Sequence, residues 1–210
     1  RLYTGGSNEY GSFVPKDDFK AVNLYKNACA GGNLRGCNNL GSCYLAGVGV
    51  DKDSRQANQL FKMACDGGEV FGCTNLAGSY SEGEGIHQDH RQANRLHKKA
   101  CDGGSMKGCY NLGYNHDAGR GVPQDYGKAN ALYQKACDGG AMYGCTSLGV
   151  NYAKGVGVPK DLTRANALYK KACDGGDMLG CSNLGFSYAN GRGVTKDLTR
   201  ANALYQKACD

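Results

Sequence analysis

The 210-residue chain carries a formal net charge of only +6, and its basic and acidic residues are interspersed, which argues against a nucleic-acid-binding protein. No run of about 18 apolar residues occurs, so the sequence predicts no membrane-spanning helix. Its 34 glycines recur at fixed places, which argues against a disordered, low-complexity chain.

Residues 1–16 are a polar, glycine-rich lead-in. From there the sequence predicts a single solenoid over residues 17–210, because a strict period of 20 to 50 residues is typical of stacked repeats. It begins with a half repeat at 17–30. Five repeats of 36 residues follow, at 31–66, 67–102, 103–138, 139–174 and 175–210. Since the chain opens at Arg1 rather than Met, we expect that an N-terminal segment has been removed, by export or by trimming. Since Cys209 lacks the partner that the repeat would place after it, we expect the native protein to continue beyond residue 210.

Each repeat is predicted to hold two antiparallel helices. In the third repeat the first helix covers about 106–118, where Cys109, Leu112, Gly113 and His116 share one helical face. Glycine inside a helix costs about 1 kcal/mol relative to alanine. Its recurrence on this face predicts that a neighbouring helix approaches closely there.

The second helix is predicted to begin after a Gly-x-Gly loop and to turn Ala129, Leu132, Tyr133 and Ala136 inward. An aspartate precedes it in every full repeat and is expected to cap its free amides, at Asp53, Asp89, Asp125, Asp161 and Asp197. A Gly-Gly pair after Cys-Asp is expected to supply a left-handed C-cap.

Twelve cysteines are present, and most of them are paired at constant spacing across the turn between repeats. Cysteines on either side of so tight a turn can reach disulfide distance. We therefore predict a disulfide at each junction: Cys29–Cys37, Cys65–Cys73, Cys101–Cys109, Cys137–Cys145 and Cys173–Cys181. Zinc is the alternative, but each junction offers two thiols and no accompanying histidine. Cys43 and Cys209 are left over, either as thiols or in intermolecular bridges.

The cysteine spacing favours an oxidising compartment, so we expect a periplasmic or secreted protein without a metal or cofactor.

The motif over residues 141–173 resembles the Sel-like repeat family. It reads Ala-x-x-Gly-Cys-x-x-Leu-Gly-x-x-Tyr-x-x-Gly-x-Gly-Val-x-x-Asp-x-x-x-Ala-x-x-Leu-Tyr-x-x-Ala-Cys, and the Cys-x7-Cys pairing points to the bacterial cysteine-rich, Helicobacter-type secreted branch. The resemblance covers nearly the whole chain from Asp17, with Ala77 in place of glycine and His116 in place of tyrosine. It implies an all-α, right-handed superhelix related to tetratricopeptide repeats, and a role in protein–protein contact.

Some members of that branch are described as binding or slowly cleaving penicillins. The chain contains no Ser-x-x-Lys, Ser-Asp-Asn or Lys-Thr-Gly, so no residue can be assigned a catalytic role and we expect no enzyme. A penicillin-binding, weak β-lactamase-type or cell-wall-related activity stays an alternative. A secreted effector or immunity protein is another.

On the first helices, the face opposite the repeated packing positions varies between repeats. It is aromatic, apolar and amide-rich, and we expect it to line a concave groove that binds a peptide. We expect a monomeric solenoid with a protein or peptide ligand there. The predicted groove residues are Arg35, Phe71, Asn75, Lys107, Tyr110, Asn111, Tyr114, Tyr143, Val150, Leu179, Asn183 and Phe186. Alternatively these side chains fill space between repeats, an interpretation favoured for Phe71 and Leu179.

Two other clusters are interpreted structurally. The lysines of the second helices are expected to form a solvated face near negative helix ends rather than a site for nucleic acid or acidic glycan: Lys98, Lys99, Lys135, Lys170, Lys171 and Lys207. His97 and His116 occupy tyrosine positions of the repeat, so we interpret them as core rings rather than metal ligands.

Overall fold

The computed structural model describes residues 17–209, which form eleven helices and no strand. The helices are α1 (Asp18–Ala30), α2 (Leu34–Ala46), α3 (Ser54–Asp66), α4 (Val70–Glu82), α5 (His90–Asp102), α6 (Met106–Ala118), α7 (Tyr126–Asp138), α8 (Met142–Lys154), α9 (Leu162–Asp174), α10 (Met178–Asn190) and α11 (Leu198–Lys207). The all-α prediction is confirmed for this part of the chain, and the predicted helix over 106–118 is α6.

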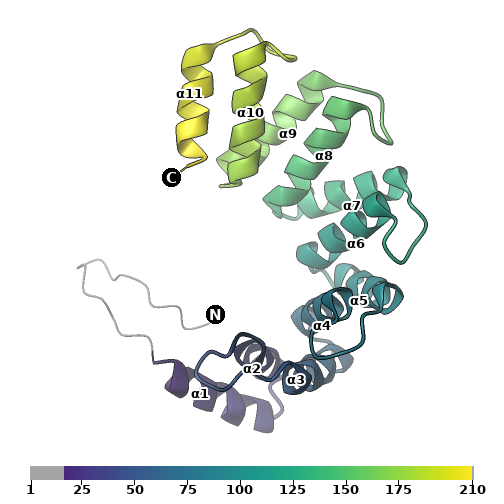
Figure 1. The fold of residues 1–210 in the computed structure, drawn as a ribbon, viewed down its shortest axis with the longest axis vertical. Coiled ribbons are helices and arrows are strands. Elements are labelled where there is room, and N and C mark those ends of the chain that lie inside the picture. Colours follow the sequence, from purple (N-terminus) through teal and green to yellow (C-terminus); the bar gives the residue numbers. More distant parts are fainter. Residues whose placement is uncertain (1–16, 210) are drawn as a thin grey trace. The chain divides into compact units, whose positions relative to one another are not determined.

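The chain divides into two compact units, Arg1–Gly103 with α1 to α5 and Gly104–Asp210 with α6 to α11. In each unit, a helix packs against its neighbours along the chain and runs opposite to them (Figure 1). We call α2, α4, α6, α8 and α10 the first helices and the others the second helices. First helices of successive repeats also touch, as α2 contacts α4 in unit 1 and α8 contacts α10 in unit 2.

Aspartate caps start the second helices, as predicted. The side chain of Asp125 accepts the backbone N–H of Lys128 at 2.9 Å, and that of Asp89 accepts those of Arg91 and Gln92. Asp53, Asp161 and Asp197 act in the same way. These backbone donors stabilise the carboxylate and hold the pKa of Asp89 and of Asp125 below the usual value.

The two glycines of the Gly-Gly pair have different conformations and different roles. Gly139, with φ −78°, follows α7 directly, and Gly140 takes the left-handed conformation with φ 90°. The predicted left-handed cap therefore lies on the second glycine. A Cβ atom on the first glycine would meet the flexible side chain of Met106 from α6, which would have to shift.

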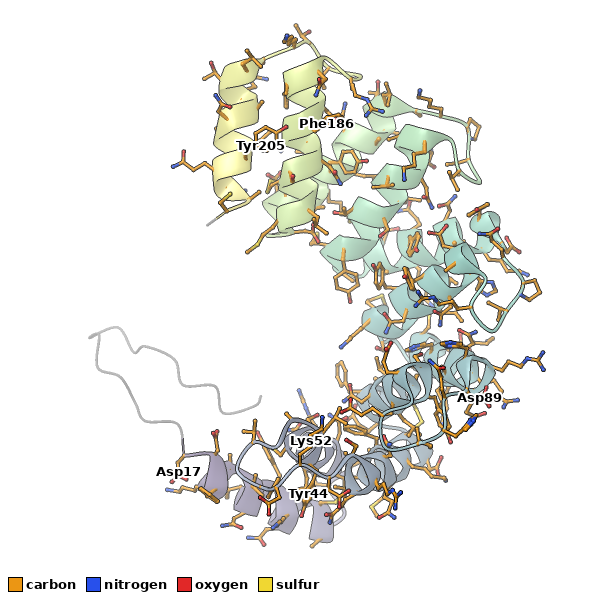
Figure 2. All side chains as sticks on the ribbon, viewed as in Figure 1. Asp17, Tyr44, Lys52, Asp89, Phe186 and Tyr205 are labelled. Carbon is orange, nitrogen blue, oxygen red and sulfur yellow. A yellow bond between two sulfur atoms is a disulfide. The ribbon has the colours of Figure 1, made fainter. Side chains whose placement is uncertain are left out.

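Close packing explains the glycine in the middle of four of the five first helices, where α4 has Ala77 instead. A Cβ atom on Gly149 would lie 2.7 Å from the ring of Tyr169 and 3.2 Å from the backbone oxygen of Ala165. Gly185 meets Tyr205 of α11 in the same way, and Figure 2 shows Tyr205 pointing toward α10. The expected close approach of a neighbouring helix is confirmed.

The disulfides tie the end of a second helix to the start of the next first helix. The S–S bonds Cys29–Cys37, Cys65–Cys73, Cys137–Cys145 and Cys173–Cys181 are present, with Cα atoms 4.4 to 4.6 Å apart. Cys101 and Cys109 are also disulfide-bonded. Cys43, which is buried, and Cys209, which is exposed, lie outside these bridges.

Glycine before the second cysteine allows this short spacing. A Cβ atom on Gly144 would lie 2.9 Å from the Cβ atom of Ala136 and 3.0 Å from the amide nitrogen of Cys137. Only glycine lets the two backbones meet so closely, and that approach brings Cys137 and Cys145 within bonding distance.

A buried asparagine on three of the second helices, which we did not predict, links its repeat to the loop of the next. Asn58, Asn130 and Asn166 donate their side-chain amides to the backbone oxygens of Glu84, Val156 and Arg192 at 2.7 to 2.9 Å. Each acceptor is the middle residue of a Gly-x-Gly loop. The Ala-Asn dipeptide that recurs in the second helices was the available sequence signal.

We expect Asn130→Ala to lower the free energy of unfolding by about 2–3 kcal/mol. The change removes the bond to Val156 and leaves the amide of Asn151, which donates to the Oδ1 atom of Asn130 at 2.8 Å, without its buried acceptor. Urea denaturation followed by circular dichroism measures the effect. Asn202→Ala is the matched control, since Asn202 holds the same repeat position but is exposed. Equal losses in both variants would contradict the role of the buried amide.

Candidate peptide-binding surface

Large apolar side chains stand exposed on the first helices. The exposed fractions are 49% for Phe71, 40% for Tyr114, 36% for Tyr143, 70% for Leu179 and 47% for Phe186. The expectation that Phe71 and Leu179 fill space between repeats was therefore wrong. Each is the second residue of its helix, and its side chain is exposed to solvent.

The remaining predicted groove residues differ in exposure. Arg35 and Lys107 are exposed, and five others are half-buried: Asn75, Tyr110, Asn111, Val150 and Asn183. Tyr110 packs against the rings of Tyr133 and Tyr143, with centroids 5.5 and 4.5 Å away. For Tyr110 the packing role is thus the larger one.

One predicted groove residue, Asn75, already makes a side-chain hydrogen bond within the protein. Asn75 of α4 donates its side-chain N–H to the Oδ1 atom of Asn38 on α2 at 2.9 Å. This bond links the first helices of successive repeats in unit 1. It leaves Asn75 with less capacity for a peptide backbone than the sequence implied.

Two arginines extend the exposed surface and were missed at the level of the sequence. The guanidinium of Arg120 lies 5.0 Å from the ring centroid of Tyr114, and that of Arg192 lies 5.4 Å from the ring centroid of Phe186. Both arginines are the middle residue of a Gly-x-Gly loop. Comparing repeats offered the signal, because arginine occupies this position only in the two repeats with an aromatic residue six places earlier.

A pocket of about 290 Å³ opens in unit 2 between α8, α9 and α10. The predicted groove residues Val150, Asn183 and Phe186 line it, together with Arg192. Figure 2 labels Phe186 on α10. The pKa of Tyr169, which also lines the pocket, is raised because burial disfavours the phenolate, while the positive charge of Arg192 acts in the opposite direction.

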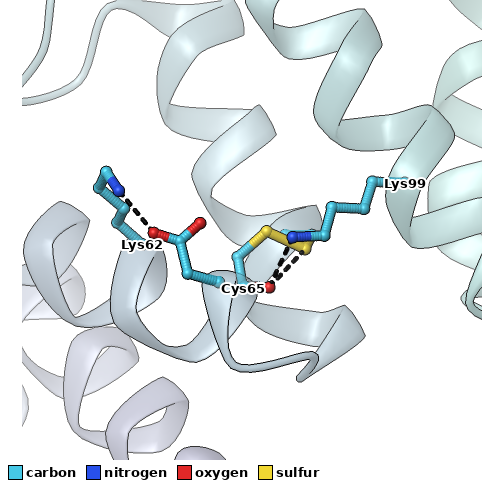
Figure 3. Close-up of polar contacts among 5 residues, drawn as sticks. Lys62, Cys65 and Lys99 are labelled. Carbon is cyan, nitrogen blue, oxygen red and sulfur yellow. Dashed lines mark hydrogen bonds and ion pairs between the residues drawn. A yellow bond between two sulfur atoms is a disulfide. The ribbon is translucent and has the colours of Figure 1, made fainter.

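The lysines of the second helices mostly have acidic or backbone partners. Lys98 pairs with Asp102, Lys170 with Asp174 and Lys171 with Asp138. In unit 1 the Nζ atom of Lys99 donates to the backbone oxygen of Cys65 at 2.9 Å, beside the ion pair of Lys62 (Figure 3). The hydrogen bond to Asp174 raises the pKa of Lys170, and that bond lowers the pKa of Asp174. This arrangement supports a solvated, charge-balanced face.

The histidines lie where the core interpretation placed them, since His97 is 2% exposed and His116 is half-buried. Across residues 17–209, no three His, Cys, Asp or Glu side chains gather in a way that would hold a metal ion. Among the described helices, none combines the length and apolar character needed to cross a bilayer.

The Sel1 repeat profile matches six segments that together cover nearly the whole chain: residues 5–33, 34–69, 70–105, 107–140, 143–177 and 179–210. The chain belongs to the Sel1 repeat family. Its second Sel1 repeat begins at Leu34, so each family repeat is one first helix followed by one second helix. The segment at 5–33 includes residues 5–16, which lie outside the described part of the chain, so the predicted lead-in at 1–16 keeps its status as a prediction.

Solved Sel1-type structures share this architecture. A Sel1 repeat protein from Oxalobacter formigenes is 29% identical with a TM-score of 0.83, covering 91% of this chain and 83% of that one. c5321, a protective antigen present in uropathogenic Escherichia coli strains, is 29% identical with a TM-score of 0.80 over 93% of this chain. This Sel1 chain spans 42% of the length of c5321.

Helicobacter pylori cysteine rich protein B is similar as well. It is 30% identical with a TM-score of 0.51, covering 64% of this chain and 97% of its own. The predicted likeness to cysteine-rich Sel1 proteins is confirmed. Comparison with curated proteins gives no significant match.

Proposed function

We propose that this Sel1 repeat protein is an extracytoplasmic scaffold that binds a peptide or an extended protein segment on its first helices. The exposed side chains of Tyr114, Tyr143, Leu179 and Phe186 in unit 2 carry the proposal, and Phe71 is exposed on a first helix of unit 1. Aromatic and large aliphatic side chains dominate the binding energy of protein interfaces. Their exposure on the faces that vary between repeats favours recognition rather than packing.

The disulfides support a location outside the cytoplasm. Ten cysteines are bonded, and such bridges form and persist in oxidising compartments. We therefore place the scaffold in the periplasm or in the secreted fraction.

An effector or immunity role would use the same binding surface with a different partner. The penicillin-related alternative has less support, because the sequence lacks the Ser-x-x-Lys motif that such chemistry uses.

We expect the wild-type protein to enrich specific sequences from a phage-displayed library of random twelve-residue peptides. The double variant Tyr114→Ala/Phe186→Ala should bind those peptides at least about tenfold more weakly, because two exposed rings at a protein interface are worth more than 1 kcal/mol. Fluorescence anisotropy with the selected peptides measures the loss. Thermal unfolding should hardly change, since neither ring belongs to the buried core.

The control variant is Met63→Ala/Leu198→Ala. These side chains are 54% and 58% exposed but lie on second helices, so the control should bind like the wild type. Equal losses in both double variants, or no enrichment of peptides at all, would contradict a binding surface on the first helices.

A further inference from the structure

We propose that the pocket between α8, α9 and α10 selects an acidic side chain that neighbours a bulky apolar side chain in an extended peptide. This inference rests on the proposed function and adds the chemistry of the partner. Three observations support it: the side chains that line the pocket, the charge at the pocket, and the residues at the corresponding repeat positions in unit 1.

The walls combine apolar and polar side chains, and the space is sized for one side chain. Val150, Leu162 and Phe186 line the pocket, whose volume is about 290 Å³. Pockets that enclose a whole small-molecule ligand are mostly larger, up to about 1,000 Å³. A Leu-, Ile- or Phe-sized side chain of a peptide therefore suits this space better than a complete cofactor.

The charge at the pocket is positive and uncompensated. Lys154 and Arg192 line it, and no aspartate or glutamate does. Over residues 17–209, neither cation is found in an ion pair. The stacking of Arg192 on the Phe186 ring, with 5.4 Å between guanidinium carbon and centroid, holds the charge beside the apolar wall. A guanidinium stacked in this way keeps its in-plane N–H donors for a carboxylate.

Unit 1 shows that this combination does not follow from the repeat itself. At the corresponding positions, three repeats earlier, the residues that replace Val150, Lys154, Leu162, Phe186 and Arg192 are Ser42, Ala46, Ser54, Gly78 and Glu84. The apolar side chains and both cations are absent there. The carboxylate of Glu84 is moreover paired with the Nζ atom of Lys52 at 2.7 Å.

The apolar surface continues past the pocket, which favours a segment within a peptide over a chain end. Tyr143 and Leu179 lie two turns toward the start of α8 and α10, and both are exposed. Additional peptide residues can thus bind there while one acidic residue meets the two cations. Two cations beside an apolar pocket also suit a single carboxylate better than a polyanion.

The experiment compares the full wild-type chain with Lys154→Glu/Arg192→Glu in selections from the random twelve-residue phage library. We expect the wild type to enrich peptides with Asp or Glu next to Leu, Ile or Phe. In the best synthetic peptide, replacing that acid by its amide should weaken binding about tenfold. The reversed variant should lose the peptide and enrich Lys or Arg at the same place. Lys196→Glu/Lys207→Glu carries the same net charge change away from the pocket, and its selection should match the wild type.

Each result decides between distinct conclusions. Peptides that depend on Phe186 but show no acidic residue, and bind equally to the reversed variant, would overturn the acidic preference and leave the proposed function intact. Absence of any enriched peptide would remove both. A single-stranded DNA oligonucleotide of twelve nucleotides that binds as tightly as the best peptide and competes with it would overturn the assignment in favour of a polyanion. Thermal unfolding of the reversed variant should match the wild type, because both replaced side chains are exposed.

Discussion

Loss of a single junction disulfide should lower the free energy of unfolding by about 2–3 kcal/mol. In the double variant Cys137→Ala/Cys145→Ala, the unfolded chain regains the freedom that an eight-residue separation had removed. The junction of α7 and α8 also loses the covalent tie that holds the two backbones together. We expect the midpoint of thermal unfolding to fall by about 5–10 °C, followed by far-ultraviolet circular dichroism.

Cys209→Ala is the control for cysteine replacement, because Cys209 is exposed and lies outside the bridges. Its thermal midpoint should match the wild type. Alkylation of the denatured, unreduced wild type should modify only two of the twelve cysteines, Cys43 and Cys209. Modification of ten or more would exclude the disulfides and, with them, the oxidising compartment.

Reduction of all disulfides should lower the free energy of unfolding far more than the loss of a single disulfide does. Ten cysteines are disulfide-bonded, and the summed contribution of their bridges is similar to the whole free energy of unfolding of a typical domain, about 5–15 kcal/mol. Each repeat contacts mainly its neighbours, so no distant contact replaces a lost tie. Helical circular dichroism that stays unchanged in excess reductant would show that packing alone maintains the fold.

Gly157→Ala should cost about 3 kcal/mol or more, the largest effect that we expect from a single added methyl group. Gly157 has φ +65°, and its Cβ atom would lie 2.5 Å from the Cβ atom and 2.8 Å from the carbonyl carbon of Tyr126. The left-handed conformation costs alanine about 1–2 kcal/mol, and overpacking adds about 1–3 kcal/mol. The displaced loop would also carry Val156 away from the amide of Asn130.

Gly140→Ala separates the two costs. Gly140 is also left-handed, with φ +90°, but no atom lies within 4 Å of an added Cβ atom. We expect it to lose only the conformational part, about 1–2 kcal/mol. Urea denaturation of both variants gives the comparison. A Gly157→Ala variant no less stable than Gly140→Ala would show that the loop does not press on the start of α7.

The sequence predicted well those features that depend on a few neighbouring residues. Residues at most thirteen positions apart determine the aspartate caps, the helix at 106–118 and the junction disulfides. A short segment of sequence is therefore enough to predict each of them. The glycine on the buried face of the first helix also revealed a close contact, although its partner ring, that of Tyr169 for Gly149, became known only from the packed pair.

The candidate binding surface was predicted less well. Helical period shows which residues share a face but not how far a neighbouring repeat covers that face. The sequence therefore favoured packing for Phe71 and Leu179, which the structure leaves exposed, and it did not reveal the ring contacts that Tyr110 makes with Tyr133 and Tyr143. The stacking of Arg192 on Phe186 and the bond from Asn166 to the Arg192 carbonyl depend on where the Gly-x-Gly loop lands after the helices have packed.

By itself, the sequence determined that this chain is a Sel1-type array of helix pairs with a sulfur bridge at each junction, because those instructions are short-range and repeated. Only the tertiary structure decided which variable side chains reach solvent and which cations stand beside an apolar pocket. These properties arise where separate helices and loops meet, and there the geometry of helix packing, rather than local preference, sets the distances.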